Sequence, residues 1–232
     1  MSPSTRRDGT AAPVITIDGP SGSGKGTISQ AVAEQLGWHY LDSGAMYRLL
    51  AFAALQKGVA LDDADALVRL SGQLARACSL PTAADPTVRL EGREVTGELR
   101  TEATGAAASQ IAALPPVRAA LLDWQRKCRK PPGLVADGRD MGSVIFPDAG
   151  LKIFLTASPR VRAERRYNQL KNMGKEEDLA ALIGEVEARD RRDATRAAAP
   201  LKPAPDALII DNSEQGIAAT VTAVLEAARK KF

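Results

Sequence analysis

The chain has few of the residues on which metal sites, disulfide frameworks and histidine chemistry depend. Its 232 residues include two cysteines and one histidine. Cys78 and Cys128 lie far apart and in no metal-ligand spacing, so we predict two reduced thiols, as in a cytoplasmic protein. His39 lies within a strand-like run, where packing or a surface position explains a histidine more often than catalysis does.

Long apolar runs and a strong charge of one sign are also missing. No run of about 18 apolar residues occurs, so no membrane-spanning helix is indicated. The net charge of +3 is too small to indicate nucleic-acid binding by itself. Residues 1–13 lack an apolar core, and we predict a disordered tail there rather than a secretion signal. Residues 14–232 are expected to form one cytoplasmic domain, monomeric by default.

A glycine-rich stretch near the amino terminus carries the strongest functional signal. Gly19 and the Gly24-Lys25 pair fit the spacing G-x-x-x-x-G-K, between an apolar run at 14–17 and a helical pattern that ends at Gly37. Glycines let backbone N–H groups turn toward one anion, and Lys25 adds a full positive charge. The loop is predicted to bind ATP through Gly19, Pro20, Ser21, Gly22, Ser23, Gly24, Lys25, Gly26 and Thr27.

The residue after Lys25 departs from the general phosphate-loop motif. That motif places Ser or Thr there to bind magnesium, whereas this chain has Gly26, with Thr27 one position later. We expect Mg²⁺ to accompany ATP, held mainly by phosphates and waters, and we assign no metal ligand to the protein. A glycine-rich turn without a ligand is the alternative, which the flanking strand and helix patterns disfavour.

Apolar runs alternate with helical patterns along the rest of the chain. This alternation predicts an α/β fold in three layers, with a central parallel sheet of about five strands and ligands at the carboxyl ends of the strands. A helical pattern, a proline break and a hairpin between Val88 and Val95 indicate a small inserted lobe at about 62–105. The runs predicted as strands are 14–17, 38–41, 134–136, 151–155 and 207–210.

Two helical stretches are rich in charge. The first contains Arg162, Arg165 and Arg166, and the second contains Arg189, Arg192, Asp193 and Arg196. Each set recurs at intervals that place it on one helical face. We interpret the first as a helical lid at about 158–176, because arginines on a lid suit the charge that spreads over a transferring phosphoryl group. The second suits a substrate-facing helix. Solvated helices with ion-pair support are the alternatives.

A third charged stretch, Asp137-Gly138-Arg139-Asp140, follows the run at 134–136. Ligands bind at such strand ends in parallel sheets. Arg139 can bind a phosphate with two hydrogen bonds, and Asp140 can accept one from an exocyclic amino group such as N4 of cytosine. A turn with an internal salt bridge is the alternative.

Four motifs together resemble those of the bacterial cytidylate kinases, in the nucleoside monophosphate kinase group. They are residues 19–27, 41–48, 136–142 and 189–196, and the resemblance runs from about Val14 to the last helix. It implies ATP as donor and CMP or dCMP as acceptor, with no covalent nucleophile. Lys25, Arg139, Arg162, Arg165 and Arg166 would then act in catalysis. The implied acceptor residues are Ser43, Arg118 and Asp140 for the base, Arg48, Arg139 and Arg196 for the phosphate, and Ser109, Arg189 and Asp193 for the sugar.

Three other functions stay open at this point. The first is a kinase for another small acceptor, such as UMP, AMP or shikimate, and Asp140 is the residue that discriminates it from a CMP kinase. A nucleic-acid-linked ATPase would show a basic stripe. An ATP-binding module without catalysis would phosphorylate no acceptor, and Lys25→Ala would weaken its binding of ATP.

Overall fold

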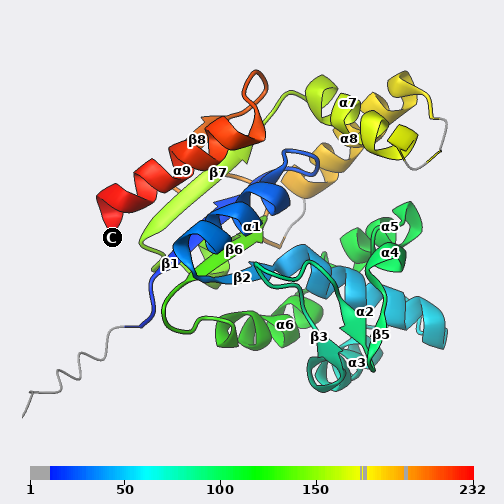
Figure 1. Ribbon diagram of the computed structural model, residues 1–232. Coiled ribbons are helices and arrows are strands. Elements are labelled where there is room, and N and C mark those ends of the chain that lie inside the picture. Colours follow the sequence, from blue (N-terminus) through cyan, green and yellow to red (C-terminus); the bar gives the residue numbers. More distant parts are fainter. Residues whose placement is uncertain (1–10, 173, 175–176, 196–197) are drawn as a thin grey trace, which may run out of the picture.

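The computed structural model describes residues 11–172, 174, 177–195 and 198–232 (Figure 1). A parallel five-stranded sheet in the order β2-β6-β1-β7-β8 forms its centre. Each run predicted as a strand forms one of these, which confirms the predicted α/β fold. Most of the predicted disordered tail lies outside the described residues. The strands are β1 (Val14–Asp18), β2 (His39–Asp42), β6 (Leu134–Gly138), β7 (Leu151–Thr156) and β8 (Leu208–Asp211).

Helices cover both faces of this sheet. On one face, α1 (Lys25–Leu36) and α9 (Ile217–Lys231) share a hydrophobic cluster with Ile15 and Ile17 of β1. On the other face, α2 (Ser43–Lys57), α6 (Pro115–Lys127) and the short π-helix η1 (Met141–Ile145) pack against Val14. Alternate side chains of β1 point to opposite faces, so the whole strand is buried and reads as a continuous apolar run.

The chain between β2 and β6 forms a second lobe beside the sheet. Its helices α3 (Ala64–Ala77), α4 (Thr96–Leu99) and α5 (Glu102–Ile111) share one hydrophobic cluster with α2 and α6. A small antiparallel sheet joins β3 (Cys78–Ser79), β4 (Arg89–Leu90) and β5 (Arg93–Glu94). The predicted hairpin is present, with its turn at Glu91 and Gly92, which both have positive φ. Packing of the lobe runs past both ends of 62–105, because α2 and α6 belong to its core.

Two long helices, α7 (Pro159–Asn172) and α8 (Leu179–Thr195), lie together on the other side of the strand ends (Figure 1). Their shared cluster has only three fully buried apolar side chains, those of Ala163, Leu170 and Leu182. This apolar core is small compared with the clusters that contain the other helices. Within the described residues, no helix combines the length and the apolar character that crossing a membrane requires.

The parallel register brings the ends of the strands to one edge of the sheet. Asp18 lies opposite Gly138, Asp42 lies opposite Asp137, and Thr156 lies opposite Asp211. The carboxylates that follow separate apolar runs in the sequence are thus neighbours in space. This edge, between the second lobe and the α7–α8 pair, is where the candidate site lies.

Candidate active site

The loop between β1 and α1 has the geometry of a phosphate-binding loop. Gly22 and Gly24 adopt left-handed φ angles of 79° and 85°, which glycine reaches without strain. A Cβ on Gly19 would lie 2.0 Å from the carbonyl oxygen of Leu155, so no larger residue fits there. No side chain caps α1 and its first turn carries no acidic residue. The first N–H groups of the helix are therefore available to an anion.

Lys25, Asp137 and Tyr40 lie together beneath this loop. Burial lowers the pKa of Lys25 to about 7 and raises the pKa of Asp137 to about 7. The Tyr40 side chain is hydrogen-bonded to Asp137, and burial, followed by the charges of Asp42 and Asp137, raises the pKa of Tyr40. A Cβ on Gly26 would lie 3.3 Å from Oδ2 of Asp137. The Ser or Thr side chain that the general motif has at this position would therefore have little room, and the Asp137 carboxylate oxygen lies nearby.

Two arginines of α7 hold the outer side of the loop. Arg162 donates from Nη1 to the carbonyl oxygen of Ser21 at 3.0 Å, and Arg165 donates from Nη1 to that of Ser23 at 3.3 Å. Asn212, just after β8, also donates to Ser23, at 2.9 Å. Arg162 is 2% exposed and lies against the loop rather than in open solvent. The predicted lid arginines are thus brought to the phosphate loop.

The third of these arginines, Arg166, connects the two sides of the site. Its guanidinium is ion-paired with Glu102 at the start of α5 and also donates to Gln169 at 2.9 Å. Glu102 is 67% exposed, so this ion pair adds little stability. A phosphate can displace such a partner at small cost.

The predicted base-reading residues converge at the end of β6. Asp140 is ion-paired with Arg118 of α6, and their side chains are only 7% and 12% exposed. Ser43 lies beside them, because a Cβ on Gly138 would approach its Oγ to 2.7 Å. The predicted alternative, an internal salt bridge within 137–140, is wrong for Asp140, which pairs with another helix. The cap of α2 is Asp42, which accepts the N–H of Ala45 at 2.9 Å.

Asp18 holds the backbone that carries Asp140. Its Oδ1 and Oδ2 accept the N–H groups of Met141 and Gly142, each at 2.8 Å. Burial raises the pKa of Asp18 to about 6, although these two N–H groups lower it. The carboxylate joins the residue before the phosphate loop to the residues after Asp140.

A cluster of arginines lies near the Asp140–Arg118 pair. Arg48 comes from α2, Arg139 from the end of β6 and Arg189 from α8. Burial lowers the pKa of Arg189 to about 10, and the nearby charges of Arg139 and Arg48 lower it further. The buried Nε of Arg189 has no hydrogen-bond partner within the described residues. Like charges held together with an unsatisfied donor favour an anionic ligand.

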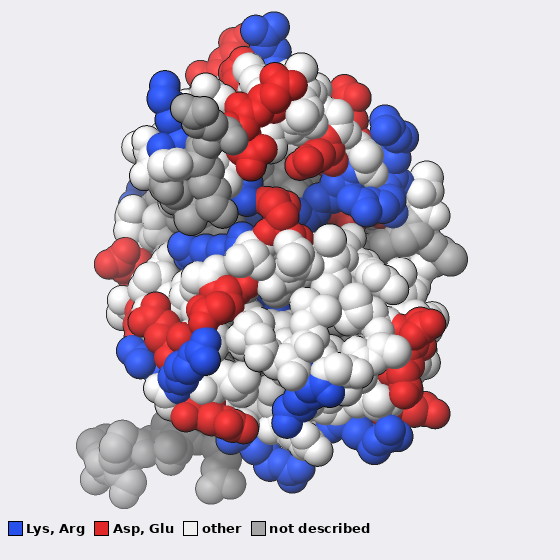
Figure 2. Space-filling model, turned by 90° about the vertical axis from the view of Figure 1, so that its right-hand side faces the viewer, with Lys and Arg blue, Asp and Glu red and all other residues white. Residues whose placement is uncertain are grey.

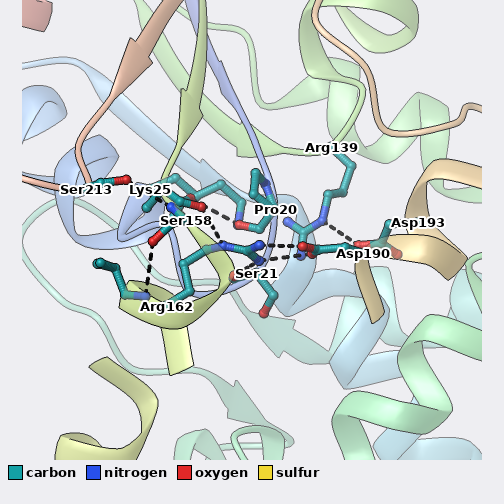
Figure 3. Close-up of polar contacts among 12 residues, drawn as sticks. Pro20, Ser21, Lys25, Arg139, Ser158, Arg162, Asp190, Asp193 and Ser213 are labelled. Carbon is teal, nitrogen blue, oxygen red and sulfur yellow. Dashed lines mark hydrogen bonds and ion pairs between the residues drawn. The ribbon is translucent and has the colours of Figure 1, made fainter. Parts of the chain in front are cut away.

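Helix α8 supplies one partner for this cluster. Its Asp193, 6% exposed, accepts a hydrogen bond from Nε of Arg139 at 3.0 Å (Figure 3). Arg192, which is predicted to share this helical face, is exposed. Ser109 is half-buried on α5. Arg196 lies outside the described residues.

Three polar residues of this site were not predicted, and Asp137 was predicted only as part of the charged stretch 137–140, without a role of its own. Asp18 and Asn212 each stand at the carboxyl end of a parallel strand, a position that could have indicated them. Asp190 pairs with Arg162 through both carboxylate oxygens, and no local signal distinguishes it from its charged neighbours. The described part of the chain holds no cluster of three His, Cys, Asp or Glu side chains suited to a metal ion.

Comparisons with known proteins agree with this geometry. The family model described as cytidylate kinase matches residues 15–230. The cytidylate kinase of Pseudomonas paraeruginosa is 55% identical over 216 residues, which cover 93% of this chain and 94% of that protein. That of Methylococcus capsulatus is 56% identical over 207 residues, covering 88% of this chain and 91% of that protein. On these matches, and with the phosphate loop and the cluster of arginines in place, the chain belongs to the cytidylate kinase family.

Proposed function

We propose that the protein transfers the γ-phosphoryl group of ATP to CMP or dCMP, giving ADP and CDP or dCDP, in pyrimidine nucleotide metabolism. The observation that carries this proposal is the group of charged side chains at the end of β6. A buried Asp140–Arg118 pair lies there beside three clustered arginines, next to the phosphate loop. This group offers polar contacts for a base and positive charge for a phosphate.

The base would be recognised by Ser43, Arg118 and Asp140. A carboxylate accepts a hydrogen bond from the amino group at C4 of cytosine but repels the carbonyl oxygen at C4 of uracil. Because Asp140 pairs with Arg118 as a carboxylate, whose oxygens only accept hydrogen bonds, the pair favours cytosine. A purine monophosphate is the wrong size for the same contacts.

The acceptor phosphate would bind the cluster of Arg48, Arg139 and Arg189, together with Arg196. Arg48 lies against Gly105 of α5 and donates to the carbonyl oxygen of Leu99 at 2.7 Å, which leaves its other donors for a ligand. The sugar would contact Ser109 and Asp193, with Arg189 placed between the sugar and phosphate positions.

The donor triphosphate would lie in the loop of residues 19–27, with Lys25 charged. Mg²⁺ enters with ATP as part of the substrate and neutralises charge on its phosphates. The site suits such an ion, since Asp137 presents an oxygen beside Gly26 and phosphates and waters can supply the other ligands. Arg165 and Arg166 would contact the transferring group, whereas Arg162 would contribute by holding the loop.

The reaction needs no covalent nucleophile. An oxygen of the CMP phosphate attacks the γ-phosphorus in line, and the bond from that phosphorus to the bridging oxygen of ADP breaks. The residues contribute by positioning and by neutralising charge. We propose further that the lobe at about 62–105 and the lid at about 158–176 close over both substrates and exclude water, which limits hydrolysis of ATP.

A nucleic-acid-linked ATPase is less well supported. On the face shown in Figure 2, Lys and Arg side chains lie in groups that Asp and Glu interrupt, unlike a continuous basic stripe. The proposed partners are therefore CMP, dCMP and ATP, for a cytoplasmic, monomeric enzyme.

The test is turnover with separate acceptors. Purified protein receives ATP and Mg²⁺ with CMP, dCMP, UMP, AMP or GMP, and ADP formation is measured. Fast turnover with CMP and dCMP is expected, with little for the purines. Turnover without any acceptor would support an ATPase instead. A binding module without catalysis would behave differently. Lys25→Ala would weaken its binding of ATP, but the wild-type protein would phosphorylate none of the five acceptors.

A further inference from the structure

Two carbonyl groups of the phosphate loop accept hydrogen bonds from side chains outside the loop. Ser21 accepts from Arg162 at 3.0 Å, and Ser23 accepts from Asn212 at 2.9 Å. In a peptide unit, N–H and C=O point in opposite directions. Fixing these carbonyl oxygens outward therefore helps to turn the adjacent N–H groups inward, toward a bound triphosphate. These hydrogen bonds therefore affect ATP binding, although the residues that donate them do not contact ATP.

A carboxylate and a backbone carbonyl hold Arg162 in this position. Its Nη1 donates to Oδ1 of Asp190 at 2.9 Å, its Nη2 pairs with Oδ2, and its Nε donates to the carbonyl oxygen of Ala157 at 2.9 Å (Figure 3). The Arg162 side chain is 3% exposed and that of Asp190 is 28% exposed. A buried guanidinium needs a counter-charge, and the two-pronged pairing fixes the plane of the guanidinium.

The same helix carries the contacts of the acceptor side. Asp193, three residues after Asp190, pairs with Arg139, and Arg189 directly precedes Asp190. Figure 3 shows the two ion pairs side by side, Arg162 with Asp190 and Arg139 with Asp193. Within four residues, α8 thus contacts the phosphate loop through Arg162 and the proposed acceptor pocket through Arg139.

We propose that Asp190 is a positioning residue that, through Arg162, sets the shape of the phosphate loop and couples ATP binding to acceptor binding. An acceptor phosphate between Arg139 and Arg189 fixes α8. The helix in turn fixes Asp190, and Arg162 then holds Ser21 in the position that ATP requires. By linkage, ATP strengthens acceptor binding by the same factor. The coupling part of this proposal rests on the proposed function; the loop part does not.

The test measures binding of a non-hydrolysable ATP analogue and of CMP by calorimetry, each alone and with the other present. For Asp190→Asn, the Kd of the ATP analogue is expected to rise about tenfold, although Asp190 touches no nucleotide. The Kd of CMP alone is expected to change less than threefold, and the coupling factor is expected to fall to about one. Asp190→Glu, which keeps the charge, should recover part of both effects. Glu187→Gln, an exposed carboxylate of the same helix, should change neither.

Two results would overturn the proposal. One is an unchanged affinity of Asp190→Asn for the ATP analogue in a variant that melts at the wild-type temperature. The other is an unchanged coupling factor, or a wild type in which the two ligands bind independently. Failure of the proposed function looks different: the wild type then binds no CMP and forms no ADP with it. In that case the ATP-analogue affinity of the Asp190 variants still decides the loop role.

Discussion

Replacing Asp140 by alanine is expected to change both the recognition of the base and the stability of the fold, and the two effects can be measured separately. The substitution removes an acceptor proposed to face the amino group of cytosine. A hydrogen bond to a charged group contributes about 1.5–3 kcal/mol. At about 1.4 kcal/mol per tenfold, the preference for CMP over UMP should fall roughly 10- to 150-fold.

The same change has a second, structural effect. It leaves Arg118, whose side chain is 12% exposed, without its counter-charge. Breaking a buried ion pair from one side costs about 3–5 kcal/mol of folding free energy. We therefore expect a clearly lower melting temperature beside the lost preference. Arg118→Met in the Asp140→Ala background removes the unpaired cation and should recover stability, but not the preference.

The assay compares kcat/KM for CMP and UMP together with thermal melts. Asp123→Ala, at an exposed carboxylate on α6, is the matched control and should leave both unchanged. A lower melting temperature with an unchanged CMP-to-UMP ratio would refute the reasoning, because Asp140 would then serve only to hold Arg118.

Three further predictions concern the phosphate loop and its surroundings. Lys25 has a pKa of about 7 and is therefore mostly neutral at pH 8. Binding of metal-free ATP should raise this pKa, so that the protein takes up roughly one proton on binding. Calorimetry in buffers of different ionisation enthalpy measures this uptake, and a value of zero would contradict it. Gly22→Ala forces a left-handed φ on alanine, at about 1–2 kcal/mol, and brings its Cβ to 3.1 Å from that of Arg162. ATP affinity should fall about tenfold, whereas the helical control Gly72→Ala should not change it. Asp18→Asn offers one acceptor oxygen to two N–H groups, so the KM for CMP should rise about tenfold with that for ATP unchanged. In the wild type, kcat/KM for CMP should fall as the pH drops through about 6, because protonation of Asp18 removes an acceptor. An equal rise of both KM values in Asp18→Asn would argue for general unfolding instead.

Local patterns were sufficient for much of the fold. The five strands of the central sheet are formed by apolar runs, of which only β8 is largely exposed, and the glycines of the phosphate loop stand at fixed spacing. Helix ends were also legible: Gly37 ends α1 with a left-handed φ of 66°. The elements that were not predicted are short. Strand β3 has two residues and α4 has four, lengths at which periodicity carries no information.

Side-chain pairings between distant elements could not be predicted from such local patterns. Asp140 could equally have paired within its own turn, and only the packing of α6 places Arg118 against it. Arg162 and Arg166 occupy one face of a helix, yet one is buried against the phosphate loop and the other reaches Glu102 on the second lobe. Which partner a charged side chain takes depends on the position of whole helices, not on residues nearby in the chain.

The sequence by itself determined the class of fold, the position of the phosphate loop and the residue types of the site, because hydrophobic periodicity and glycine spacing act locally. Only the tertiary structure decided how those residues meet. The parallel register places Asp18, Asp42 and Asp137 at one edge of the sheet. The position of α8 brings Asp190 to Arg162 and Asp193 to Arg139. Burial then shifts the pKa of Lys25 and of Asp137, because the charged forms lose water only when the chain is folded around them.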